Sequence, residues 1–228
     1  MAGASEAITR VHAAEEHGHH PPYLQHHFVS AEQQFDAAKL GMWIFLATEI
    51  LLFSGMFVAY AVYRVWHPEV FQAASKLLDW RLGGLNTLVL LASSYTVALA
   101  VHYAQLGNQK RLLQNLWLTI ALAGVFMVVK YFEYTEKFHH HIFPGGNYAY
   151  EGLQLPYVGQ FFSIYFVMTG IHGLHVLVGM GVLTWVALKA RRGVFSSEYY
   201  TPVEVSALYW HLVDIIWIFL FPLLYLIH

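Results

Sequence analysis

Five ionisable side chains lie well inside long apolar stretches of the sequence, where charged groups are rare, and a sixth, Glu133, lies nearer the outer end of its predicted helix. They are Glu49, Glu133, His172, His175, His211 and Asp214. An ionisable group in the middle of a membrane helix costs about 2.5–3.5 kcal/mol on insertion, so such groups usually serve a function. Side chains of these types ligate haem, carry protons or hold helices together by hydrogen bonds.

The three histidines and Asp214 form two pairs, each spaced as neighbours on a helix. His172 and His175 are three residues apart, as are His211 and Asp214, so each pair shares a helical face. We expect Asp214 and His211 to hydrogen-bond to each other. Gly170 and Gly173 lie beside the first pair, and residues this small allow helices to approach closely.

The two glutamates have different neighbours along the chain. Lys130 precedes Glu133 by three residues and Lys137 follows it by four, which predicts both lysines on its helical face. Glu49 has no basic residue within a turn of its own helix. Because burial disfavours a charged carboxylate, we expect Glu49 to be protonated for much of the time. Glu49 is therefore the candidate for a proton-linked or lipid-linked role.

Three interpretations of these residues compete. Histidines at mid-depth could ligate haem, as in b-type cytochromes. The polar groups could instead carry protons, or they could be satisfied groups that fasten helices. Two histidines on one helix lack the cross-helix partners that a haem needs, so we favour helix fastening for the histidines.

The elements that must position these groups are membrane helices. The chain of 228 residues is 57% hydrophobic and 11% charged, and its charged residues are nearly absent from five long stretches. Each stretch reaches the roughly 20 residues that a helix needs to cross a membrane. The stretches are continuously apolar, whereas the strands of membrane barrels alternate. We predict an all-α bundle of five transmembrane helices at about 40–66, 83–106, 112–138, 157–190 and 203–228, within a domain covering 36–228.

Residues 1–35 are predicted to form a polar, histidine-rich tail in solvent, and no metal is assigned to it. The loops on the N-terminal side carry seven Lys and Arg residues and the opposite side carries four, which predicts a cytoplasmic N-terminus and an outer C-terminus. Cysteine is absent from the sequence, which excludes disulfides, iron–sulfur clusters and c-type haem attachment. A net charge of −2 and the lack of basic clusters do not suggest nucleic acid as a partner.

Five motifs, in order along the chain, resemble those of one membrane family. The run YWHLVDIIWIFLFP is similar to the last helix of cytochrome c oxidase subunit III, and ATEILLF to the helix that bears the family's carbodiimide-reactive carboxylate. The remaining motifs are LNT followed by LLASS, FEY, and TGIHGLHV. The resemblance covers about residues 38–228, which contain these five motifs at 47–53, 85–94, 132–134, 169–176 and 209–222.

The resemblance implies an accessory subunit of a proton-pumping haem–copper terminal oxidase in aerobic respiratory electron transport. Oxidase activity would belong to the complex, with haem and copper in partner subunits and with no cofactor or catalytic residue in this chain. The implied partners are subunit I as the main contact, subunit II, further small subunits, phospholipid and a larger respiratory assembly. Glu49 would be the buried carboxylate, and the implied intramembrane polar network is His172, His175, His211, Asp214 and Glu133.

Many family members have seven helices, and the first two have no counterpart here, so the chain resembles the shorter bacterial form. A multi-pass protein of a prokaryotic cytoplasmic membrane is therefore expected. Alternatives are subunit III of a quinol oxidase and an accessory subunit of nitric oxide reductase. A haem-binding membrane anchor and a proton-coupled transporter are less favoured, the latter because no inverted repeat is visible.

Overall fold

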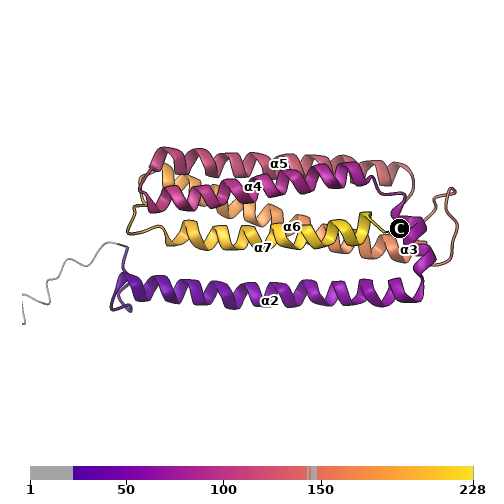
Figure 1. Cartoon of the computed structure of the whole chain (residues 1–228), viewed down its shortest axis with the longest axis horizontal. Helices are drawn as coiled ribbons and strands as arrows, with labels where there is room; N and C mark the ends of the chain where they lie inside the picture. Colours follow the sequence, from indigo (N-terminus) through magenta and orange to yellow (C-terminus); the bar gives the residue numbers. More distant parts are fainter. Residues whose placement is uncertain (1–22, 143, 145–147, 228) are drawn as a thin grey trace, which may run out of the picture. The chain divides into compact units, whose positions relative to one another are not determined.

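The computed structural model describes residues 23–142, 144 and 148–227, and the regular structure in these ranges is entirely helical. Five helices are long and apolar enough to cross a membrane, which confirms the predicted class. One further short helix, α3, lies between the first two of them along the chain, and the sequence did not predict it. The helices are α2 (Ala31–Trp66), α3 (Pro68–Ser75), α4 (Trp80–Gln105), α5 (Gln109–His139), α6 (Val158–Arg191) and α7 (Thr201–Tyr225) (Figure 1).

The chain divides into two compact units, residues 1–40 and 41–228. In the first unit, α2 begins at Ala31, nine residues before the expected start. The Gln33 backbone N–H donates to Ser30 Oγ at 3.1 Å, and the Val29 N–H donates to Gln33 Oε1 at 2.9 Å. This exchange is close to a capping box, whose Ser-x-x-Gln signature is visible in the sequence. Most of the histidine-rich tail lies outside the described residues, so the prediction for it stays a prediction.

In the second unit, α4 to α7 form a bundle in which each helix packs against two others of the four. The neighbouring pairs are α4 with α5, α5 with α6, α6 with α7, and α7 with α4 (Figure 1). Two buried indoles of α7 fasten it to α4: Trp210 Nε1 donates to Ser93 Oγ and Trp217 Nε1 donates to Thr87 Oγ1, both at 3.0 Å. A buried indole N–H needs such an acceptor, so these bonds set the register of the two helices.

The part of α2 in this unit is attached to the bundle along a narrow stripe. Its buried residues Leu46, Phe53 and Tyr60 are spaced by seven, so they line one side of the helix. The Tyr60 hydroxyl donates to the Leu223 carbonyl near the end of α7. The rest of this helix presents apolar side chains outward.

Two glycines of α6 differ in the space around them. A Cβ at Gly179 would lie 2.8 Å from the ring of Trp210 and 3.1 Å from Tyr209, whereas a Cβ at Gly173 would meet nothing within 4 Å. Close helix approach therefore depends on Gly179. The expectation that Gly173 serves this purpose within the chain is wrong, because it faces open space.

Gly179→Ala is expected to destabilise the subunit by about 1–3 kcal/mol, because the buried Trp210 ring cannot move without breaking its bond to Ser93. Gly173→Ala is the matched control and is expected to be neutral or stabilising by up to about 1 kcal/mol, since alanine favours a helix. Thermal unfolding of the purified protein in detergent measures both. Equal loss in the two variants would contradict the packing described for α6 and α7.

Candidate functional site

Glu133 of α5 is completely buried and accepts hydrogen bonds from three helices. Its Oε1 accepts from Tyr225 at 2.6 Å, from Tyr165 at 2.9 Å and from Lys137 at 3.4 Å. Its Oε2 accepts from Lys130 at 2.9 Å. Both lysines face Glu133, as their spacing predicted. The two tyrosines come from α6 and α7, and their contribution could not be read from spacing along one helix.

The Lys130 ammonium uses its three hydrogens on oxygens of this cluster. Besides Glu133, it donates to the hydroxyls of Tyr225 at 2.6 Å and Tyr165 at 3.4 Å. Aromatic rings within about 6 Å of a cation stabilise it through the negative charge of their faces. The ammonium lies 4.8–5.8 Å from the centroids of four rings, those of Tyr134, Tyr165, Trp217 and Tyr225.

The cluster holds two ammonium groups around one carboxylate, and the two lysines contribute unequally. Both lysines are buried, Lys130 at 7% exposed and Lys137 at 4%, but Lys130 makes three hydrogen bonds whereas Lys137 makes a single long bond to Glu133. Removing Lys130 leaves Glu133 with Lys137 alone at 3.4 Å, while removing Lys137 keeps the closer pair at 2.9 Å. Lys130 and Glu133 are therefore the structural ion pair of the bundle.

Glu49 has a basic partner on another helix, which its own helix did not reveal. Glu49 Oε2 lies 2.8 Å from Nε2 of His175 on α6, and the two side chains are 16% and 15% exposed. The other ring nitrogen, Nδ1, lies 2.8 Å from the Ile171 carbonyl. A carbonyl oxygen only accepts, so Nδ1 carries a hydrogen and donates it.

This geometry restricts how Glu49 and His175 interact. With Nδ1 as a donor, a neutral His175 has a lone pair on Nε2 and accepts from a protonated Glu49. A charged His175 instead donates from Nε2 to a carboxylate. Both arrangements place one proton between the two residues, so the pair can hold a proton and pass it between them.

The predicted bond between Asp214 and His211 is wrong. His211 Nδ1 lies 2.7 Å from Oγ of Ser94 on α4, because the neighbouring helix offers a hydroxyl at better geometry than a residue one turn along. Asp214 is 2% exposed and makes no hydrogen bond of normal geometry, although the Ser94 hydroxyl lies beside its carboxyl. His211 thus fastens α7 to α4, and Asp214 does not.

His172 and His175 serve different neighbours despite their spacing. His172 is fully buried, and its ring packs against Phe126 at 5.6 Å and Trp217 at 5.2 Å between centroids. Neither of its ring nitrogens makes a hydrogen bond. His175 turns to α2 and Glu49. Within the described residues, no group of three or more His, Cys, Asp or Glu side chains is placed to hold a metal ion.

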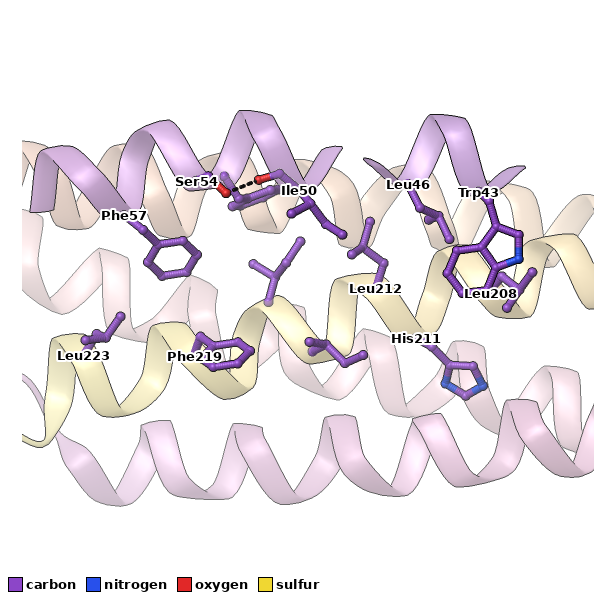
Figure 2. A pocket seen from close by; sticks show the side chains of 13 residues that line it. Trp43, Leu46, Ile50, Ser54, Phe57, Leu208, His211, Leu212, Phe219 and Leu223 are labelled. Carbon is purple, nitrogen blue, oxygen red and sulfur yellow. Dashed lines mark hydrogen bonds between the residues drawn. The ribbon is translucent and has the colours of Figure 1, made fainter. Parts of the chain in front are cut away.

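An apolar groove of about 610 Å³ runs between α2 and α7 (Figure 2). Trp43, Leu208 and His211 lie at one end, and Phe57 and Leu223 lie at the other (Figure 2). The remaining lining side chains are apolar except for Ser54. They are Leu46, Ile50, Phe53, Ser54, Leu212, Ile215, Ile216 and Phe219.

Lys130→Met is expected to destabilise the subunit by about 3–5 kcal/mol, because it leaves Glu133 buried without its close cation. Lys137→Met, the matched control, is expected to change stability by less than about 1 kcal/mol, since a balanced pair remains. Thermal unfolding in detergent at neutral pH compares the two. A larger loss in the Lys137 variant would contradict the assignment of the structural ion pair.

A hydrophobic carbodiimide is expected to label Glu49, because this reagent reacts with a protonated carboxyl that is reachable from the membrane. Glu133 provides the internal comparison and should stay unlabelled, since it is enclosed by two lysines and two tyrosines. Peptide mass spectrometry after labelling in membranes locates the modified residue. Labelling of Glu133 with protection of Glu49 would exclude the proposed difference between these carboxyls.

Comparison with known proteins identifies relatives along almost the whole chain. Residues 22–228 match the family described as cytochrome c oxidase subunit III. Cytochrome c oxidase subunit 3 of Thermostichus vulcanus is 32% identical over 205 residues, covering 86% of this chain and 90% of that protein. The protein of the same name from Loxodonta africana is 32% identical, covering 91% and 72%. A probable quinol oxidase subunit 3 of Staphylococcus haemolyticus is 30% identical, covering 83% and 88%.

Proposed function

The chain belongs to the cytochrome c oxidase subunit III family, and from this premise we propose that it supports proton uptake and stability in an oxidase whose haem and copper reside in partner subunits. It is a multi-pass membrane protein and a subunit III of the haem–copper oxidases. The observation that carries the proposal is the family match across residues 22–228. Four of the six intramembrane polar groups, Glu49, Glu133, His175 and His211, bond to other residues of the chain, which suits a subunit that holds no redox centre of its own.

The main partner we propose is subunit I, with subunit II and smaller subunits nearby. An outward stripe on α2 supports this contact. Its members are spaced by seven residues, 61–78% exposed and apolar, a pattern typical of a helix that packs along a partner helix. They are Ile44, Leu51, Val58 and Val65.

Glu49 and His175 are the residues we propose for a proton-linked role, since the pair holds one proton at the side of the bundle that faces α2. Bound phospholipid is proposed in a second groove of about 470 Å³ between α5 and α6. Gly170 and Gly173 leave this groove open, and Leu174 and Leu177 line it with apolar surface. An acyl chain fits such a surface without a polar partner.

The proposed location is a prokaryotic cytoplasmic membrane, with the N-terminus in the cytoplasm. A quinol oxidase is the second candidate, because one relative bears the name probable quinol oxidase subunit 3. The partner subunits distinguish the two, since a copper-binding subunit II would indicate cytochrome c as the electron donor.

Affinity purification of the tagged chain from its native membrane is expected to recover a haem–copper subunit with its Soret absorption. The chain expressed alone is expected to bind no haem, because its mid-depth histidines do not face one another across helices. Subunit mass spectrometry and optical spectra measure both. Recovery without any haem–copper subunit, or a Soret band from the isolated chain, would contradict the proposal.

A further inference from the structure

Two side chains of the groove between α2 and α7 keep a polar atom that bonds to nothing in the described part of the chain, the indole N–H of Trp43 and the imidazole of His211. The other polar lining residue is Ser54. The Ser54 hydroxyl donates to the Ile50 carbonyl of its own helix at 2.6 Å, so it is satisfied. His211 uses Nδ1 on Ser94, and its Nε2 makes no hydrogen bond to the described part of the chain. A ligand in this groove can therefore be anchored at His211.

This anchor lies deep in the membrane. His211 follows the first residue of α7, Thr201, by ten positions, which corresponds to about 15 Å along a helix. The hydrocarbon core is about 30 Å thick, so a helix that enters it near Thr201 places the imidazole near its middle. A phospholipid keeps its polar head at the membrane surface and cannot bring it to this depth. The ligand that matches His211 has a weakly polar group that enters the hydrocarbon.

The dimensions of the groove limit the rest of the ligand. It extends along α2 from Trp43 to Phe57, about 21 Å at the helical rise. A helix 10 Å wide and of that length would occupy roughly 1,600 Å³, whereas the groove holds about 610 Å³. A single flexible hydrocarbon tail is the better match. The flat indole of Trp43 lies at the same end as His211, where a planar ring would sit (Figure 2).

We propose that the α2–α7 groove binds an isoprenoid quinone. One ring oxygen bonds to His211 Nε2 near Trp43, and the isoprenoid tail lies along the apolar walls toward Phe57 and Leu223. We propose binding alone, with no reaction of the quinone at this site. The proposal is the same whether the oxidase takes electrons from cytochrome c or from quinol.

Ser94 and Asp214 allow the same site to accept both redox forms. With quinone bound, the Ser94 hydroxyl donates to Nδ1, and Nε2–H donates to the ring carbonyl. With quinol bound, the ring hydroxyl donates to Nε2, Nδ1–H donates to Ser94, and the Ser94 hydroxyl turns to Asp214. The buried carboxyl of Asp214, which otherwise lacks a hydrogen bond, is the acceptor that the quinol form requires. Asp214 is thus a positioning residue that acts through Ser94.

The test is photolabelling of the purified oxidase complex in nanodiscs with an azido-substituted prenyl quinone. Labelled peptides are expected from α2 around Trp43 and from α7 around His211. His211→Phe should weaken the binding about fivefold to tenfold, the effect of one buried hydrogen bond. Ser54→Ala is the matched control and should leave labelling unchanged, because that hydroxyl is bonded within its own helix.

Competition with unlabelled quinone and quinol tests the role of Asp214. Asp214→Leu should weaken competition by the quinol about fivefold while leaving the quinone unchanged. Asp214→Asn keeps an oxygen acceptor and should preserve both. If His211→Phe prevents assembly, Ile215→Trp replaces it, because this 50% exposed residue can fill the groove without disturbing the core.

Three results would overturn the proposal. They are labelling that maps outside the groove, displacement of the label by phosphatidylethanolamine as readily as by quinone, and labelling that persists in both His211→Phe and Ile215→Trp. The second result would assign the groove to a lipid chain. None of these results bears on whether the chain is an oxidase subunit, which subunit composition decides.

Discussion

The bundle depends on the hydrogen bonds and ion pairs that the buried carboxylate of Glu133 accepts. Four donors from α5, α6 and α7 converge on it inside a medium where an unpaired charge is very costly. Lys130, the cation closest to Glu133, is itself surrounded by aromatic rings, among them that of Trp217 on α7. Because α6 and α7 are held here, His175 is carried to α2 and His211 to α4. His175 and His211 are therefore positioned in part by an ion pair to which neither of them is bonded.

The three intramembrane carboxyls differ because their partners differ. Glu133 is enclosed by cations and phenols, and Glu49 lies 2.8 Å from a single imidazole. Asp214 lies beside one hydroxyl and meets no cation among the described residues. The same functional group thus occurs in a buried ion pair, in contact with one imidazole, and without a hydrogen bond.

The fold class followed from the sequence because five apolar blocks without charges permit little else in a membrane. Spacing along one helix also predicted that Lys130 and Lys137 face Glu133. The same reasoning failed for Asp214 and His211, since Ser94 of α4 competes for the imidazole. It also missed the partner of Glu49, which lies 126 residues away on α6. Contacts between helices depend on packing and register, and these are set by residues such as Gly179 and Trp210 that carry no chemistry themselves.

An experimental density map of the assembled oxidase would reveal these contacts and the neighbouring subunits together. We expect this chain to appear as a subunit with five membrane-spanning helices beside a haem–copper subunit. We also expect Glu133 to be bonded to Lys130, Tyr165 and Tyr225, and Glu49 to lie within hydrogen-bonding distance of His175. A haem ligated by His172 or His175, or a separation of Glu49 from His175 across the membrane interior, would contradict these expectations.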